Sequence, residues 1–105
     1  MKLEHYSSDK LKAQLSIIVR KYLSGSHYTL FFFGSRVDGT SKERSDVDIG
    51  LITATGLDNS AKYKIIEEIE TIKTLYTLDF VDFFRTSTEF QKIALRNIEI
   101  IDEIT

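Results

Sequence analysis

The run YTLFFFG at residues 28–34 constrains the fold more than any other part of the sequence. Aromatic and β-branched residues favour strands, and an apolar run that ends in a glycine is typical of a strand in the centre of a sheet. A polar segment, 35–45, follows, and DVDIGLIT at 46–53 then reads as a second strand. Because the connection is short, we expect these two strands to be neighbours in one sheet.

Two helical patterns flank the strands. Residues 8–23 carry an apolar stripe, with Ser8 as the expected N-cap and Gly25 just beyond the C-terminal end. Turn residues at 55–64 lead into a second helix of about 15 residues. The side chains expected to face the sheet are Leu11, Leu15, Ile18, Val19 and Tyr22 in the first helix and Ile65, Ile66, Ile69, Ile72 and Leu75 in the second.

The remaining segments predict a third strand and a third helix. TLDFVDFF at 77–84 alternates like a strand, and 86–97 has the pattern of a helix capped by Thr86 or Ser87. The residues IEIID, 98–102, are either the tail of that helix or a short final strand. The predicted fold class is therefore α+β: a small mixed sheet with helices on one face.

Composition narrows the class of protein. A length of 105 residues favours a single domain, 1–105. A net charge of −2 argues against general electrostatic binding to nucleic acid. The absence of cysteine excludes disulfides, thiolate metal sites and cysteine nucleophiles, and it fits a reducing compartment. No secretory signal is visible, and no apolar run approaches the roughly 20 residues of a membrane span. We therefore expect a cytoplasmic protein.

Two acids at the start of the second strand need an explanation. On a strand, Asp46 and Asp48 share one face, while Val47, Ile49 and Leu51 share the other and should pack under the helices. Carboxylates about 6–7 Å apart along a strand repel each other unless a cation lies between them. Oxygen ligands of this kind suit magnesium or manganese better than zinc. Such pairs also occur as ordinary loop or cap residues.

A third acid and a glycine turn could complete a site. Asp79 and Asp82 are three apart, so on a regular strand only one of them should reach Asp46 and Asp48. Glycine at 34 lets the backbone come close to a ligand, and amides at such a turn, with the Ser35 hydroxyl, form an anion-binding concavity. The guanidinium of Arg36 adds donors for phosphate. Together these groups suit a nucleoside triphosphate that carries magnesium.

Two other motifs fit less well. GSRVDGTS at 34–41 has the glycine spacing of a P-loop, but Thr40 stands where lysine is required. DVDIG resembles the start of an EF-hand loop, yet Gly50 and Leu57 fall where a ligand and the closing glutamate should be.

Gly34-Ser35, ten intervening residues and then Asp46-Val47-Asp48 resemble the signature of the DNA-polymerase-β-like nucleotidyltransferases. The context FFFGSRVDG…SDVDIGLI and the later LDFVDFF are similar, more narrowly, to the minimal nucleotidyltransferases (MNT proteins) of HEPN/MNT toxin–antitoxin pairs. The resemblance runs over nearly all of residues 8–100.

The resemblance implies roles for individual residues. Asp46 and Asp48 would hold two magnesium ions and the triphosphate, with manganese as a possible replacement. Asp79 aligns best as the third carboxylate, a metal ligand and activator of the attacking hydroxyl, with Asp82 as the fallback. The residues Gly34, Ser35 and Arg36 would hold the phosphates of the nucleotide.

The resemblance also implies a reaction and a partner. AMP would pass from ATP to a hydroxyl acceptor, expected to be a tyrosine of a HEPN-domain toxin, so that the protein acts as an antitoxin. The alternative is a non-catalytic module that neutralises the HEPN protein by docking. A homodimer or hetero-oligomer fits both readings, and neither involves a membrane or direct binding to nucleic acid.

Overall fold

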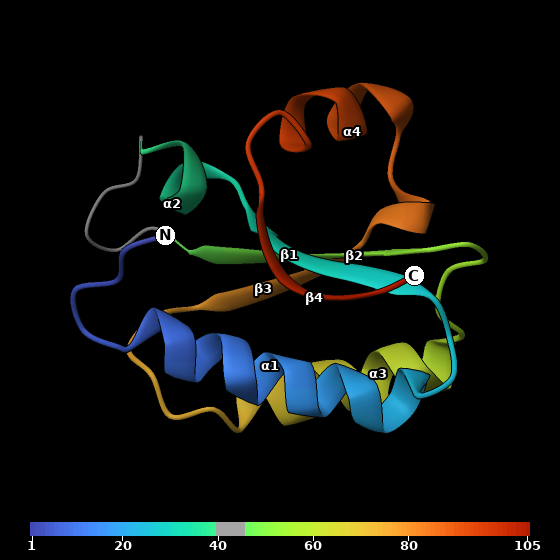
Figure 1. Cartoon of the computed structure of the whole chain (residues 1–105), viewed down its shortest axis with the longest axis horizontal. Helices are drawn as coiled ribbons and strands as arrows, with labels where there is room; N and C mark the ends of the chain where they lie inside the picture. The colour runs from blue at the N-terminus through green and yellow to red at the C-terminus, as the bar shows by residue number, and fades with distance from the viewer. Residues whose placement is uncertain (40–45) are drawn as a thin grey trace.

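The computed structural model describes residues 1–39 and 46–105 and shows a four-stranded mixed sheet with helices (Figure 1). Its elements are, in chain order, α1 (Ser8–Leu23), β1 (Tyr28–Phe33), α2 (Ser35–Asp38), β2 (Val47–Thr53), α3 (Asn59–Glu70), β3 (Leu78–Asp82), a 3-10 turn (Phe83–Arg85), α4 (Thr88–Ala94) and β4 (Glu99–Ile104). Thr40 and Ser45, which entered the motif arguments above, lie outside the described residues, as does the rest of 40–45.

The strand order is β3-β2-β1-β4, which places the two predicted neighbours in the centre of the sheet. The strands β1 and β2 pair antiparallel, with Phe33 opposite Asp48, as the short connection predicts. The strand β3 joins β2 in parallel, and β4 joins the other side of β1 antiparallel. Residues 99–102 therefore belong to a final strand, and Ile98 precedes it, so this segment is not a helix tail.

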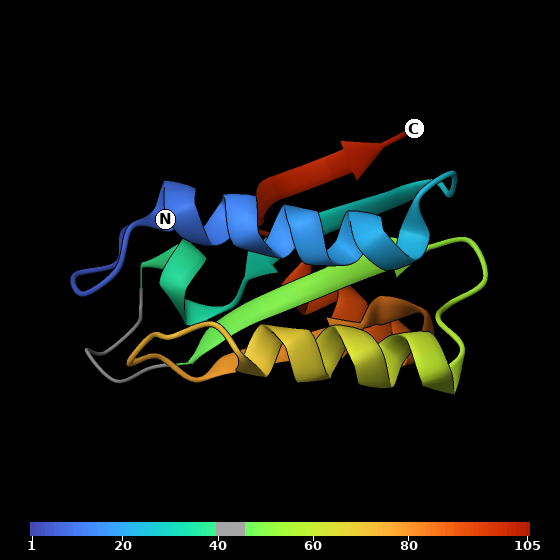
Figure 2. The ribbon, with the colours of Figure 1, turned by 90° about the horizontal axis from the view of Figure 1, so that it is seen from below.

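The main core lies between the sheet and two helices, α1 and α3, which run side by side beneath it (Figure 2). Alternation along β2 directs Val47, Ile49 and Leu51 into this core, as predicted. The carboxylate of Glu68 accepts hydrogen bonds from Lys21 and Tyr22 and so links the two helices. Within residues 1–39 and 46–105, no helix is long and apolar enough to cross a membrane.

A smaller aromatic cluster covers part of the other face of the sheet. Phe31 and Phe33 pack there against Phe83, and Phe90 of α4 approaches Phe33 edge-on and Phe83 at a tilt. The prediction that the helices cover one face of the sheet is therefore wrong for α4, which lies across the sheet from α1 and α3 (Figure 1). The reason is physical: β1 has apolar side chains on both faces, and both faces need cover.

Two helix ends differ from prediction. Ser7, and not Ser8, caps α1, because its hydroxyl accepts the backbone N–H of Lys10 at 3.1 Å. Helix α3 ends at Glu70, earlier than predicted, so Leu75 lies beyond the helix and is 88% exposed instead of facing the core. The predicted cap Ser87 is confirmed for α4.

Candidate active site

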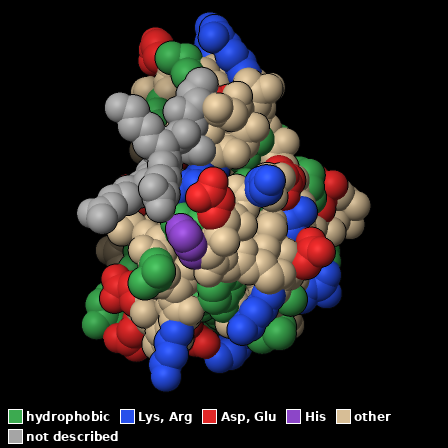
Figure 3. All heavy atoms as spheres, turned by 90° about the vertical axis from the view of Figure 1, so that its left-hand side faces the viewer, with side chains coloured by type: hydrophobic (Ala, Val, Ile, Leu, Met, Phe, Trp, Pro, Cys, Tyr) green, Lys and Arg blue, Asp and Glu red, His purple; other side chains and the backbone are tan. Residues whose placement is uncertain are grey.

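Two of the predicted acids lie directly opposite each other on neighbouring strands. In the parallel ladder of β2 and β3, Asp48 is the partner of Asp79, and adjacent strands lie about 4.8 Å apart. Asp46 comes one residue before β2 and is exposed. Figure 3, which faces this end of the sheet, shows acidic side chains beside a histidine and a basic side chain. The fold therefore gathers carboxylates where β2 and β3 begin.

The electrostatic surroundings of Asp48 favour a bound cation. The side chain is partly buried. Burial, and to a lesser extent the negative charges of Asp79 and Asp46, raise the pKa of Asp48 from its ordinary 3.8 to about 6. A group whose ionised form is disfavoured by neighbouring acids gains most from a positive ligand, because the ligand offsets the repulsion.

Gly34 brings the backbone against the Asp48 carboxylate. Its φ of 81° and ψ of −161° lie in a region that only glycine adopts readily. An added Cβ would stand 2.1 Å from Asp48 Oδ2, so the Asp48 side chain would have to shift. The Gly34 carbonyl accepts the N–H groups of Val37 and Asp38, at 3.0 and 3.1 Å, so Ser35 opens the short helix α2 directly after the turn. Gly34, Ser35 and Asp48 are thus brought together.

Arg36 points into the protein. Its side chain is 8% exposed, and its guanidinium lies 4.7 Å from the centre of the Tyr76 ring. The Tyr76 hydroxyl in turn accepts the backbone N–H groups of Glu4 and His5, at 3.0 and 3.1 Å. Sequence reasoning missed Tyr76, since it belongs to no motif and stands two residues before β3.

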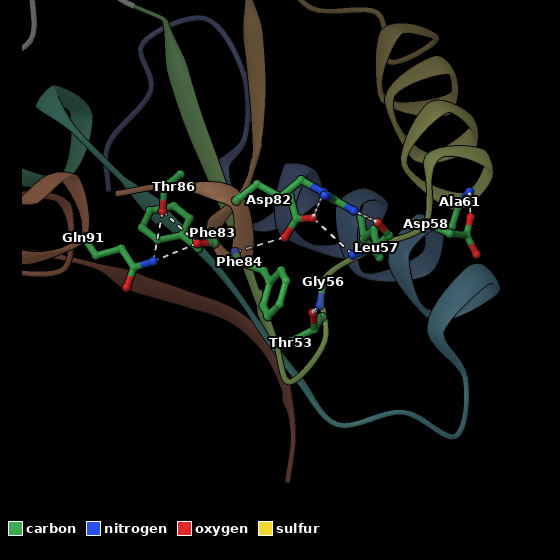
Figure 4. A network of polar contacts seen from close by, with 11 residues as sticks. Thr53, Gly56, Leu57, Asp58, Ala61, Asp82, Phe83, Phe84, Thr86 and Gln91 are labelled. Carbon is green, nitrogen blue, oxygen red and sulfur yellow. Dashed lines mark hydrogen bonds and ion pairs between the residues drawn. The ribbon is translucent and has the colours of Figure 1, made fainter. Parts of the chain in front are cut away.

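Asp82 lies apart from the acidic pair. It is 3% exposed, and its carboxylate accepts the N–H groups of Leu57 at 3.1 Å and Phe84 at 3.2 Å (Figure 4). The Arg85 Nε lies 3.5 Å from Asp82 Oδ2. Asp79 and Asp82 face opposite ways, as their spacing predicts, and it is Asp79 that neighbours Asp48.

The donor set suits a metal that takes part of its coordination from the substrate. Across residues 1–39 and 46–105, no three histidine, cysteine or acidic side chains are grouped as a complete metal site. Mg²⁺ characteristically binds one or two carboxylates together with phosphate oxygens and water. The neighbouring carboxylates of Asp48 and Asp79 fit that mode of binding, and they do not fit an all-protein cage.

These features define a class, a nucleotidyltransferase of the polymerase-β type. Residues 15–103 match the family described as "Polymerase beta, Nucleotidyltransferase", and the chain belongs to that family.

A named relative also belongs to the nucleotidyltransferases. The chain is 33% identical over 76 residues, 72% of its own length and 67% of the relative's, to the "Probable protein adenylyltransferase MntA" of Haemophilus influenzae.

Solved structures share the fold. A toxin–antitoxin structure with AMP-PNP superposes with a TM-score of 0.67 at 20% identity, covering 94% of this chain and 76% of the other. A complex of a tri-AMPylated HEPN toxin with its MNT antitoxin, from Shewanella oneidensis, gives a TM-score of 0.69 at 17% identity and covers 93% and 74%.

Proposed function

We propose that this protein transfers AMP from ATP to a hydroxyl group of a HEPN-domain toxin and thereby acts as its antitoxin. The observation that carries the proposal is the register of β2 and β3, which sets Asp48 opposite Asp79 beside the Gly34 turn. The similarity to a probable protein adenylyltransferase supports the reaction, and the fold shared with an MNT antitoxin supports the partner.

Each residue of the site has a role in the proposal. Asp46, Asp48 and Asp79 would hold two magnesium ions with the triphosphate, and bound Mg²⁺ would neutralise charge on the phosphates and on the departing pyrophosphate. The turn at Gly34 and Ser35 would receive phosphate oxygens through backbone and hydroxyl donors, and the guanidinium of Arg36 would add further donors.

The transfer itself replaces a phosphoanhydride bond of ATP by a phosphodiester bond to the acceptor. The acceptor oxygen attacks the α-phosphorus, the bond from that phosphorus to the bridging oxygen breaks, and pyrophosphate leaves. Asp79 is exposed at the start of β3, where it could accept the proton of an approaching hydroxyl. A tyrosine of the toxin is the proposed acceptor, and the structural neighbour with an AMPylated HEPN toxin supports a protein acceptor.

The test is transfer of labelled AMP from ATP to the HEPN protein in the presence of magnesium. Asp46→Asn and Asp48→Asn should each reduce the rate at least 100-fold, because electrostatic stabilisation of the transferring group is lost. Asp9→Asn, an exposed acid in the first turn of α1, is the matched control and should transfer normally. Mass spectrometry of the product would identify the acceptor residue. Undiminished transfer by both site variants would refute the proposal.

A second candidate function is neutralisation by docking alone. It is favoured by large apolar side chains that are exposed on and after α4, namely Phe90, Ile93, Leu95, Ile98 and Ile100. Co-expression with the toxin separates the two functions. If the double variant Asp48→Asn, Asp79→Asn still rescues growth as well as the wild type, docking suffices. If rescue is lost while the two proteins still co-purify, transfer is required.

A further inference from the structure

Tyr76 is the residue on which the segment after the glycine turn rests. Arg36 is the second residue of α2, two positions after Gly34, and its guanidinium carbon lies over the Tyr76 ring, 4.7 Å from the ring centre. Both side chains are 8% exposed, so the contact is shielded from water. Shielding strengthens the attraction between a cation and an aromatic face.

The Tyr76 ring is itself fixed from two directions. Its hydroxyl accepts two backbone N–H groups, from Glu4 and His5, in the segment before α1. The His5 ring lies 6.2 Å from the Tyr76 ring. Along the chain, Tyr76 precedes by three residues the carboxylate of Asp79. One side chain therefore joins the N-terminal segment, the glycine turn and the strand that carries the proposed third carboxylate.

We propose that Tyr76 is a positioning residue for the nucleotide, acting through Arg36. This inference rests on the proposed function. The Tyr76 ring attracts the positive charge of the guanidinium, whereas phosphate binds its fork of N–H donors, so the two contacts are compatible. Holding Arg36 and the adjoining turn in one conformation before ATP binds removes an ordering cost from the binding step.

The proposal predicts how nucleotide affinity responds to removal of the ring. Tyr76→Met keeps a flexible apolar side chain of similar size but no aromatic face. Binding of AMP-PNP with Mg²⁺ to the full chain, measured by calorimetry, should weaken about 2- to 30-fold, the range expected for loss of a shielded cation–π contact. Tyr76→Phe keeps the ring and should bind within about twofold of wild type. Tyr76→Leu replaces Tyr76→Met if the latter does not fold.

A double-mutant cycle separates positioning from general loss of structure. If Tyr76 acts through Arg36, then adding Tyr76→Met to Arg36→Ala should weaken binding no further. Tyr28→Met is the structural control, because Tyr28 is also buried but stands at the other end of β1 from Gly34. That variant should lower the melting temperature without changing affinity for AMP-PNP.

The outcomes are distinguishable. Wild type that does not bind AMP-PNP overturns both the proposed function and the role of Tyr76. If wild type binds AMP-PNP and Tyr76→Met binds it equally well, the positioning role alone is overturned. The same holds if the losses of affinity in the two single variants multiply in the double variant. Weakened binding in Tyr76→Met, retained binding in Tyr76→Phe and no further loss in the double variant support it.

Discussion

Two independent constraints oppose a side chain at position 34: the neighbouring Asp48 carboxylate and the backbone conformation of Gly34. Gly34→Ala would place a methyl group against Asp48 and force a φ that other residues avoid. We expect a loss of about 2–4 kcal/mol in the free energy of unfolding, together with loss of transfer activity. Urea denaturation followed by circular dichroism measures the former.

The control for this substitution is Gly25→Ala. Gly25 has nearly the same φ, 84°, but nothing lies within 4 Å of its missing Cβ. The free energy of unfolding of Gly25→Ala should fall by about 1 kcal/mol, the cost of the backbone conformation alone, and the variant should keep its activity. Equal losses at both glycines would show that the carboxylate beside Gly34 gives way easily.

Asp48 should make the metal-free protein less stable as pH rises. Its pKa is about 6 in the folded state and 3.8 in the ordinary range, so the folded chain holds the proton more tightly. Stability from this group is present below pH 4 and is lost as pH rises through 6. The free energy of unfolding of Asp48→Asn should therefore exceed that of wild type by about 1–2 kcal/mol at pH 7.5, and by little at pH 4. The figure at pH 7.5 is reduced because the Asp48 side chain is only partly buried.

Urea unfolding in EDTA at the two pH values measures this difference. The same substitution should abolish transfer, so stability and activity should change in opposite directions. A difference between wild type and Asp48→Asn that stays constant from pH 4 to pH 7.5 would contradict the assigned cause.

The arrangement of Asp48, Asp79 and Gly34 follows from sequence rules, whereas the packing of Arg36 does not. Alternation along a strand predicts which acid faces which way, and the glycine marks the turn. The sequence predicts Arg36 only as a phosphate donor, because nothing local indicates an aromatic partner. Its partner, Tyr76, is 40 positions away, and only the tertiary fold brings the two together.

At the scale of elements, β3 separates a reactive acid from a structural one. Asp79 is exposed beside Asp48, whereas Asp82 is buried and accepts the amides of Leu57 and Phe84. Asp79→Asn should abolish transfer and leave stability nearly unchanged. Asp82→Ala should leave two amides without an acceptor and lower the free energy of unfolding by about 2–4 kcal/mol.

Transfer assays and urea unfolding of both variants test this division. A folded Asp82→Ala protein should still transfer AMP at a rate close to that of wild type. If Asp79→Asn transfers normally and Asp82→Ala is stable but inactive, the two acids have been assigned the wrong way round.

The order of helices and strands could be predicted, but where helices end and which face they cover could not. The apolar repeat continues through Ile72 and Leu75, so periodicity alone extends α3 too far. The helix ends at Glu70 because the chain must turn back to pair β3 with β2. Likewise the second face of β1, with Phe31 and Phe33, indicates that cover is needed but not which helix supplies it.

For the molecule as a whole, one carboxylate ties α1 and β1 to β4. Asp102 accepts hydrogen bonds from Ser16 at 3.0 Å, from Arg20 twice at 2.8 Å and from Tyr28 at 2.6 Å. The hydrogen bonds from Arg20 hold the pKa of Asp102 well below its ordinary value, although burial opposes them. Asp102→Ala should therefore lower the free energy of unfolding by about 2–4 kcal/mol at pH 7.

The same network gives a pH dependence opposite to that of Asp48. A lowered pKa adds stability above pH 4, and that stability is lost as pH falls, so the gap between wild type and Asp102→Ala should narrow towards pH 3. Glu103→Gln, on the exposed side of β4, is the control and should change stability by less than about 0.5 kcal/mol. Urea titrations at pH 7 and pH 3 give both comparisons.

The pairing of β4 with β1 also bears on how the chain is made. Strand β1 occupies residues 28–33, but its partner on one side, residues 99–104, is synthesised about 70 residues later. Until β4 leaves the ribosome, that edge of β1 offers unpaired amides and carbonyls next to a row of aromatic side chains, which is a template for aggregation. Only when β4 lies along β1, as Figure 1 shows, is that edge covered.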